Sequence, residues 1–361
     1  MERQRNTSNL AKMILNSGHG ISRARWIRDY ATGGTCPSKA TVSGKTIIIT
    51  GANTGIGKET ARELARRDTR KFSAVKPHRN GGRVIMACRD MGKCETAARE
   101  IRCETLSHHV YARHLNLASL KSIRAFAKKV TEEEEHINVL INNAGIMRCP
   151  YWKTEDGFEM QFGVNHLGHF LLTNLLLEKL KNSGNGRIIN VSSLAHKVGQ
   201  IDFNDLNWEK KKYDTKAAYC QSKLANILFT KELAKRLHGS GVTVNAVHPG
   251  VTNTELGRHT GMHKSNFSNT VLGPFFLFLV KSPHLGAQPS IYLAVAEELE
   301  GISGKYFNVN KQEDSALQAL DDETARHLWE MSAKLVGLKN DNFDPQFQNN
   351  STVNMDNVRT V

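Results

Sequence analysis

Short, continuously apolar runs recur along most of the chain, and amphipathic segments separate them. The first run, KTIIIT at 45–50, is rich in β-branched residues and ends at glycines, which predicts a buried strand. Similar runs predict further strands at 83–88, 110–115, 137–142, 187–192, 242–248 and 305–309. Helical spacing of apolar residues predicts helices between most of them, at 58–67, 95–104, 120–135, 168–181 and 216–237.

This alternation predicts the fold class and the extent of one domain. Apolar strands separated by helices form a parallel sheet that is covered on both faces. Right-handed crossovers then favour a doubly wound, Rossmann-type α/β fold. We expect a single domain over 44–338, with an inserted surface loop at 68–80. A basic targeting or anchoring segment at 1–43 precedes it, and a polar, asparagine-rich tail at 339–361 follows it.

Composition and charge exclude several classes of protein. The chain has 361 residues, of which 39% are hydrophobic and 23% charged, as is typical of soluble globular proteins. Its net charge of +14 favours anionic partners, but the basic residues are scattered, so we expect no nucleic-acid binding. The six cysteines form no CxxC pair and complete no zinc-ligand spacing with histidines, so we expect no metal site.

The N-terminal residues are basic, and the chain has no apolar run of the about 18 residues that predict a transmembrane helix. Residues 1–40 combine a surplus of lysine and arginine with serine, threonine and asparagine. This bias fits an organelle-import segment, and it fits a disordered basic tail equally well.

Three glycines follow the first predicted strand, at Gly51, Gly55 and Gly57, and a predicted helix comes next. Glycine permits a tight turn whose backbone approaches a ligand closely, and the helix N-terminus offers free N–H groups to a phosphate. A glycine triplet alone is weak evidence, but its place between a strand and a helix is typical of a dinucleotide site. The turn also contains Asn53, Thr54 and Ile56.

The end of the second predicted strand bears on the choice of cofactor. Arg89 follows the strand there, and its planar donor fork would suit the 2′-phosphate of NADP. An acid at this point commonly accepts the ribose hydroxyls of NAD instead, and Asp90 is the next residue. The sequence therefore favours NADP(H) and leaves NAD(H) open, and an exposed arginine at a helix start is the alternative.

Tyr219 and Lys223 lie four residues apart in a predicted helix, so they share one face. A nearby ammonium lowers the pKa of a phenol and makes it a usable general acid or base. Ser193 follows the fifth predicted strand, where its hydroxyl would emerge at the carboxyl edge of the sheet and could hold a substrate oxygen. Thr252 and Thr254, after the sixth strand, are available to bind polar groups of a cofactor.

Together, these residues resemble the short-chain dehydrogenase/reductase family over 44–338. The segments TGANTGIGKE, ACRDM, AYCQSKLANILFTKEL and HPGVTNTELGRHTG are similar to its retinol dehydrogenase branch. The resemblance implies an oxidoreductase with NADP(H) as cofactor. It also implies retinal and retinol, or related lipophilic carbonyls and alcohols, as substrates.

The resemblance assigns a role to each candidate residue. Tyr219 would donate the proton to the carbonyl, Lys223 would lower its pKa and bind the nicotinamide ribose, and Ser193 would hold the substrate oxygen. Asn165 would kink its helix and hold a water that links Lys223 to solvent. Further residues would line the cofactor cleft: Asn116, Asn142, Ala144, Gly145, Pro249, Gly250, Thr252 and Thr254.

Three features depart from the family. Asn116 stands where an acid usually contacts adenine, the insertion at 68–80 lies near the adenosine side, and residues 1–30 are polar where relatives begin with an apolar anchor. We expect Asn116 to weaken the binding of adenine. The apolar stretch 271–280 lies where the family has its substrate lid, so it suits a polyene or a peripheral membrane contact, with core packing as the alternative.

The predictions of location, assembly and substrate each leave an alternative open. The resemblance and the basic N-terminus predict a mitochondrial location, peripheral to the inner membrane, with the endoplasmic reticulum membrane as the alternative. The predicted helices at 168–181 and 216–237 could pair between subunits of a homodimer. The same chemistry on steroids or lipid-derived aldehydes, and an inactive cofactor-binding scaffold, are the alternative functions.

Overall fold

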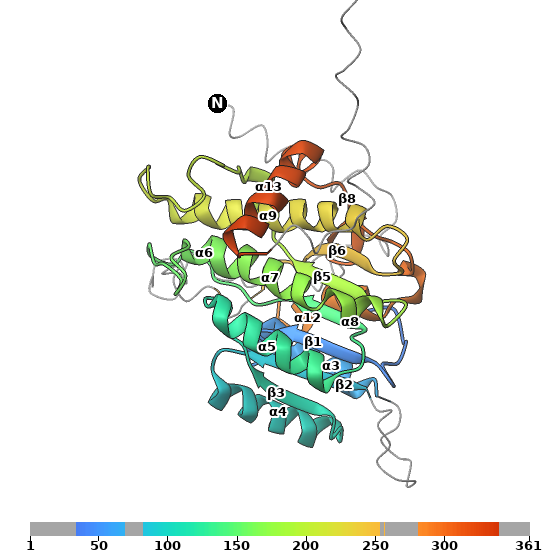
Figure 1. The fold of residues 1–361 in the computed structure, drawn as a ribbon. Coiled ribbons are helices and arrows are strands. Elements are labelled where there is room, and N and C mark those ends of the chain that lie inside the picture. Colours follow the sequence, from blue (N-terminus) through green and yellow to red (C-terminus); the bar gives the residue numbers. More distant parts are fainter. Residues whose placement is uncertain (1–33, 69–81, 253–255, 257–280, 339–361) are drawn as a thin grey trace, which may run out of the picture.

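One eight-stranded sheet forms the centre of the molecule (Figure 1). The computed structural model describes residues 34–68, 82–252, 256 and 281–338. The strand order is β3-β2-β1-β4-β5-β6-β7-β8, and all neighbours are parallel except β7 and β8. The strands are β1 (Thr46–Thr50), β2 (Arg83–Cys88), β3 (Val110–His114), β4 (Val139–Asn142), β5 (Arg187–Val191), β6 (Thr243–His248), β7 (Tyr306–Asn308) and β8 (Lys311–Glu313).

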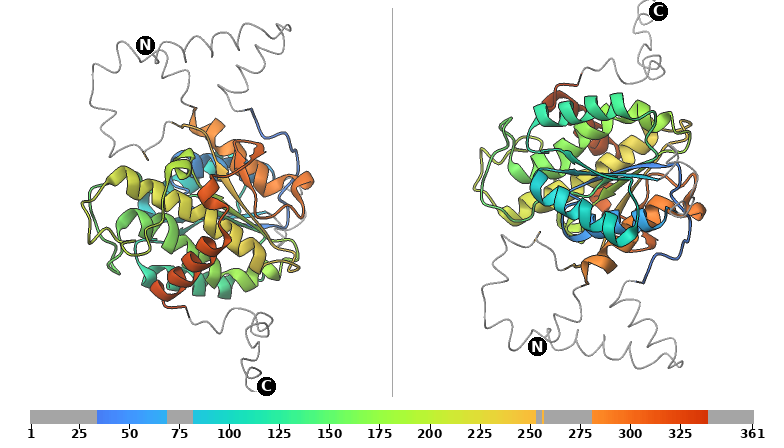
Figure 2. Two further views of the ribbon diagram at one scale, coloured as in Figure 1. Left: turned by 90° about the horizontal axis from the view of Figure 1, so that it is seen from above. Right: turned by 90° about the horizontal axis from the view of Figure 1, so that it is seen from below.

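Helices cover both faces of this sheet (Figure 2). One face packs against α3 (Gly55–Arg66), α4 (Met91–Thr105) and α12 (Pro283–Val295). The other packs against α5 (Leu120–Glu133), α7 (Gly168–Leu175), α9 (Thr215–Arg236) and α13 (Asp322–Leu335). The shorter elements are α6 (Met160–Phe162), the π-helix η2 (Gly163–Leu167), α8 (Leu177–Lys181), and the 3₁₀-helices η3 (Leu194–Val198), η5 (Glu297–Leu299) and η6 (Leu317–Ala319).

The seven predicted strands are confirmed as β1 to β7. Their apolar runs were recognisable because the central strands are buried on both sides. In β1, Ile48 belongs to one apolar cluster, whereas Ile47 and Ile49 belong to the cluster on the opposite face. The predicted doubly wound α/β fold is therefore confirmed. The last strand, β8, was not predicted, because its three residues are all exposed and have no apolar pattern.

The predicted helix at 168–181 is not one regular helix. The chain runs from α6 through the π-helix η2 into α7, and α8 begins after Leu176. A π-helix bonds each N–H one residue further back than an α-helix, so η2 changes the direction of the side chains that follow. The predicted kink near Asn165 corresponds to this π-helix, which contains that residue.

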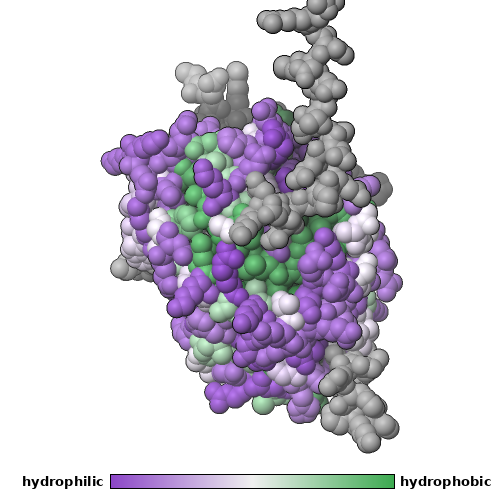
Figure 3. Space-filling model, viewed as in Figure 1, coloured by the Kyte–Doolittle hydropathy of each residue, from purple (hydrophilic) through white to green (hydrophobic). Residues whose placement is uncertain are grey.

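Helix α13 lies across α7 and α9 (Figure 1). The ring of Trp329 is 4.8 Å from that of Phe170 and 5.8 Å from that of Phe229. The hydroxyl of Ser332 lies 2.8 Å from Nε2 of His166, which is buried between the same helices. This part of the α7 and α9 surface is thus covered by the protein's own helix. In the same view, hydrophobic residues gather around α7 (Figure 3).

Candidate active site

The glycine turn between β1 and α3 has no room for side chains. Gly51 has a φ of +65°, and a Cβ there would lie 2.9 Å from Cα of Ala144. A Cβ on Gly57 would lie 2.4 Å from the carbonyl oxygen of Gly51. Thr54, the residue before α3, makes no side-chain bond to the free amides of the first turn. These amides are therefore available to an anionic ligand.

Thr50 holds the glycine turn against the end of β4. Its Oγ1 accepts hydrogen bonds from the backbone N–H groups of Asn143 and Ala144, both at 2.9 Å. The same oxygen is 2.9 Å from Nε2 of His169, whose Nδ1 is 3.1 Å from the carbonyl oxygen of Asn165. Because that carbonyl can only accept, Nδ1 carries the proton and Nε2 accepts from the Thr50 hydroxyl. Burial lowers the pKa of His169 to about 4, so the ring is neutral.

The sequence did not predict this group of hydrogen bonds, because the residues that form it come from β1, the β4 loop and α7. Asn143 reinforces it, because its Nδ2 donates to the carbonyl oxygen of Thr50 at 2.8 Å. No motif joins Thr50 to His169, which lie far apart in the sequence. Only the cluster of polar residues at the two strand ends was a usable signal.

The structure corrects the prediction for Asn142. Its side chain is 2% exposed and donates to Oγ1 of Thr173 at 3.0 Å and to Oδ1 of Asn190 at 2.8 Å. The amide therefore joins α7 to β5 inside the molecule and does not line the cofactor cleft. The next residues do reach the carboxyl edge, because Ala144 lies against Gly51 and Gly145 lies beside Lys223.

Tyr219, Lys223 and Ser193 come together at the end of β5. Lys223 Nζ is 5.7 Å from the centre of the Tyr219 ring and donates to the carbonyl oxygen of Val191 at 3.1 Å. Ser193 hydrogen-bonds to Tyr219. Its Oγ also accepts from the backbone N–H of Ala195 at 3.2 Å, which fixes the hydroxyl at the start of η3. The constellation predicted from spacing and strand ends is thus assembled in space.

Burial dominates the electrostatics of this group. It raises the pKa of Tyr219 to about 12, and the hydrogen bond with Ser193 opposes this shift. The direction is opposite to the predicted lowering by the Lys223 ammonium. Burial also lowers the pKa of Lys223 to about 8. Both shifts favour the uncharged form of the side chain, because the surroundings solvate charge poorly.

Asn165 is completely buried in η2 and makes three hydrogen bonds. Its Oδ1 accepts from the N–H of Ile146 at 2.8 Å, and its Nδ2 donates to the carbonyl oxygen of Ile146 and to Oγ of Ser222, both at 2.9 Å. A Cβ on Gly145 would lie 3.4 Å from Asn165 Oδ1 and 3.7 Å from Lys223 Nζ. Asn165 and Lys223 therefore face the same glycine.

The residues that were predicted to bind the adenosine lie at the ends of β2 and β3. Arg89 is exposed, and within the described part of the chain no hydrogen bond or ion pair engages it. The carboxylate of Asp90 caps α4 by accepting from the N–H of Lys93 at 3.0 Å.

Asn116 is already engaged by protein groups beyond the end of β3. Its Oδ1 accepts from the N–H of Ala118 at 3.1 Å, and its Nδ2 donates to the Glu155 carboxylate at 3.0 Å. The side-chain carbonyl that was expected to contact adenine is thus used in a local turn. A carbonyl oxygen has a second lone pair, so the contact is weakened rather than excluded.

The loop after β6 approaches the glycine turn at the start of α12. Gly250, which follows Pro249, has a φ of +88°. A Cβ on Gly286, in the first turn of α12, would lie 2.5 Å from Thr252 Oγ1 and 3.2 Å from Ile56 Cγ1. Thr252 and Ile56 of the glycine turn therefore meet at α12. Thr254 lies outside the described residues, as do the stretch 271–280 and nearly all of the insertion at 68–80.

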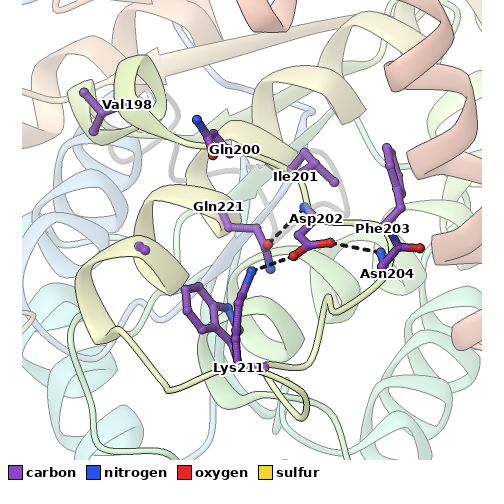
Figure 4. A pocket seen from close by; sticks show the side chains of 10 residues that line it. Val198, Gln200, Ile201, Asp202, Phe203, Asn204, Lys211 and Gln221 are labelled. Carbon is purple, nitrogen blue, oxygen red and sulfur yellow. Dashed lines mark hydrogen bonds and ion pairs between the residues drawn. The ribbon is translucent and has the colours of Figure 1, made fainter.

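A separate pocket of about 420 Å³ opens beside the start of α9 (Figure 4). Asp202 and Lys211 form an ion pair of 2.7 Å on its wall. Ala217 and Gln221 also line it, and each lies two residues from Tyr219, about 200° around the helix. The pocket is therefore on the other side of α9 from the catalytic group. Among the described residues, no cluster of His, Cys, Asp and Glu could hold a metal ion, and no helix could span a membrane.

Comparison with known proteins identifies the family. A family model for short chain dehydrogenases matches residues 45–264. The chain belongs to the short-chain dehydrogenase family. It is 69% identical to human retinol dehydrogenase 13 over 313 residues, covering 87% of this chain and 91% of that protein. Human retinol dehydrogenase 12 is 51% identical, with 87% and 93% covered.

The solved structures agree with this assignment. A crystal structure of an uncharacterised protein from Mycobacterium paratuberculosis has a TM-score of 0.65 and 37% identity. The match covers 84% of this chain and 97% of that one. The short-chain dehydrogenase predicted from the motifs is thus confirmed, and the protein is an oxidoreductase that acts on CH–OH groups. The fold binds a nicotinamide cofactor, and the glycine turn, which has no space for a Cβ at Gly51 or Gly57, fits its diphosphate.

Proposed function

We propose that this short-chain dehydrogenase interconverts retinal and retinol with NADP(H). The assembly of Tyr219, Ser193 and Lys223 beside the glycine turn is the observation that carries the proposed chemistry. The high identity to human retinol dehydrogenase 13 supports the substrate. The resemblance leads us to expect a lipophilic carbonyl or alcohol, and a retinoid in particular.

The protein's own groups bind the substrate oxygen and move a proton. Ser193, fixed at the start of η3, hydrogen-bonds the carbonyl oxygen, and Tyr219 donates its phenolic proton to that oxygen during reduction. The raised pKa keeps the phenol protonated at neutral pH, so the proton that it donates is present, although the same shift makes the phenol a weaker acid. The bound nicotinamide supplies the hydride. In this proposal Lys223 binds the nicotinamide ribose, and Asn165 holds a water that links Lys223 to solvent.

The proposed cofactor site extends from the glycine turn to the strand ends. Arg89 would bind the 2′-phosphate of NADP(H), because its guanidinium is exposed, and Asp90 is occupied as the cap of α4. The residues that would hold the cofactor are Gly51, Asn53, Thr54, Gly55, Ile56, Gly57, Arg89, Asn116, Ala144, Gly145, Pro249, Gly250, Thr252, Thr254, Tyr219 and Lys223.

Location and chain organisation are part of the same proposal. We infer that residues 1–43 form a targeting or anchoring segment before the catalytic domain at 44–338, and that 339–361 form a polar tail. The basic N-terminus and the similarity to retinol dehydrogenases support a mitochondrial protein in peripheral contact with the inner membrane. Localisation of the tagged full chain, against endoplasmic reticulum and mitochondrial markers, tests this proposal.

The decisive experiment measures oxidation of NADPH with all-trans-retinal, with NADH in place of NADPH as a parallel reaction. We expect turnover that prefers NADPH, and a loss of about 100-fold or more in Y219F. Y111F is the matched control, because it removes the same hydroxyl from a tyrosine on β3, away from the site. Activity on other lipophilic aldehydes but not on retinal would contradict the substrate. Wild-type activity in Y219F would contradict the mechanism.

A further inference from the structure

Lys281 lies directly before α12, in contact with the loop after β6. Its backbone N–H donates to the carbonyl oxygen of Val251 at 2.8 Å, and the residue pairs with Thr252 in a parallel bridge. Its side chain passes over Gly250, since a Cβ there would lie 2.8 Å from both Cε and Nζ of Lys281. The positive φ and the missing side chain of Gly250 thus leave room for this lysine.

The ammonium of Lys281 is buried, and the part of the chain that the structure describes provides no counter-ion for it. The residue is 6% exposed, and among the described residues no hydrogen bond or ion pair engages Nζ. Burial lowers the pKa of nearby His248, and the charges of Lys281, His196, Lys223 and Lys197 lower it further, so the groups that act on this imidazole are basic. A buried charge without a partner is unfavourable, and one beside a binding site indicates a ligand of opposite charge.

The position of Lys281 identifies the anion. Helix α12 begins beside Lys281, and its Gly286 lies between Thr252 and Ile56 of the glycine turn. Lys281 therefore lies directly before the helix that packs on the glycine turn, and the free amides of that turn are at the start of α3. These amides form the site for the diphosphate of a dinucleotide. A diphosphate bound to these amides and to Lys281 would meet backbone N–H groups from one segment and an ammonium from the other.

We propose that Lys281 is a cofactor-binding residue whose ammonium pairs with the diphosphate of the nicotinamide dinucleotide. The inference rests on the proposed function and adds a residue that no sequence motif indicated. The lysine binds a part that NADP(H) and NAD(H) share. It therefore contributes to the affinity for both cofactors and not to the specificity for one of them. Arg89 is proposed to determine that specificity.

Binding titrations of the full-length protein, without substrate, test the assignment. K281M removes the charge and keeps an unbranched side chain, and K334M does the same at an exposed lysine of α13. We expect K281M to weaken the binding of NADP⁺ and of NAD⁺ by the same factor, about tenfold or more. K334M should leave both affinities unchanged. Adenosine 2′-phosphate, which has no diphosphate, should bind K281M as well as it binds the wild type.

Thermal unfolding separates a binding role from a structural one. Without ligand, K281M should unfold at the wild-type temperature or above, because it removes an unpaired buried charge. A lower unfolding temperature, or unchanged dinucleotide affinity in K281M, would overturn the assignment and leave the proposed function standing. If the wild type binds neither dinucleotide, the proposed function fails, and this inference fails with it.

Discussion

Lys223 is buried in α9 with 3% of its surface exposed, and its charge is unfavourable there. Burial lowers its pKa from 10.5 to about 8. Below about pH 8 the lysine is charged in both the folded and the unfolded protein, so the folded state carries the full cost of burying the ammonium. Between about pH 8 and 10.5 only the unfolded state still binds the proton, so the free energy of unfolding rises with pH.

We therefore expect K223M to be inactive yet more stable at neutral pH, by roughly 2 kcal/mol after loss of the bond to Val191. Chemical unfolding at a series of pH values measures this difference, which should shrink as the pH rises toward 10.5. K128M, at a lysine with 78% of its side chain exposed, is the control and should leave stability unchanged. If K223M is less stable at pH 7, the ammonium is not the unfavourable group that its burial implies.

The sequence predicted the candidate catalytic residues because each has a local signal. Tyr219 and Lys223 have helical spacing, and Ser193 ends a buried strand. The direction of a side chain depends on packing, which explains the error at Asn142, whose amide turns into the interior. Lys281 has no local signal at all, because its setting is made by Gly250.

At the scale of elements, strands were easier to predict than the segment that carries Asn165. The central strands are apolar on both faces and bounded by turns, so their pattern is clear. The π-helix η2 follows a single helical turn, α6, and the buried side chain of Glu159 is the N-cap of that turn. An apolar pattern cannot distinguish such a helix from a regular one, because the two differ only in that each backbone hydrogen bond spans one more residue.

Glu159 fixes the start of that segment. Its carboxylate is completely buried, accepts from the N–H groups of Gln161 at 2.9 Å and Phe162 at 2.8 Å, and binds the Tyr213 hydroxyl at 2.9 Å. In E159Q an NH₂ group replaces one of the two carboxylate oxygens. This donor would then face another donor, such as a backbone N–H. We expect a loss of about 1–3 kcal/mol in the free energy of unfolding, measured in denaturant.

The same change at an exposed site provides the control. E178Q alters a glutamate whose side chain is 79% exposed, so its stability should stay within about 0.5 kcal/mol of wild type. Because η2 positions Asn165 beside Gly145, E159Q should also lower turnover. Equal stability of the two variants would show that the buried carboxylate does not hold the segment in place.

At the scale of the whole molecule, α13 completes the layer of helices over α7 and α9. Trp329 packs on Phe170, and the guanidinium of Arg236 lies 4.5 Å from the centre of its ring. The sequence gives no indication of this docking, because a helix far along the chain covers the surface. The layer also encloses His166, which lies between Phe162 and Phe170.

Four buried histidines have lowered pKa values and make the whole fold sensitive to acid, and the shifts are largest at three of them. Burial lowers the pKa of His166 to about 3 and those of His169 and His248 to about 4, against 6.5 for a free imidazole. In the unfolded chain each binds a proton as the pH falls below 6.5, whereas the folded protein excludes it. The free energy of unfolding therefore decreases with falling pH in the window between about 4 and 6.5.

Each excluded proton contributes a slope of up to about 1.4 kcal/mol per pH unit, so the three together approach about 4. Buried Glu159 opposes part of this slope, because its pKa is raised. We expect H248N to reduce the slope by about one proton between about pH 4.5 and 6, and H108N, at an exposed histidine, to leave it unchanged. Denaturant unfolding at closely spaced pH values measures the slopes. An H248N slope equal to that of the wild type would mean that the imidazole of His248 already binds a proton in the folded protein.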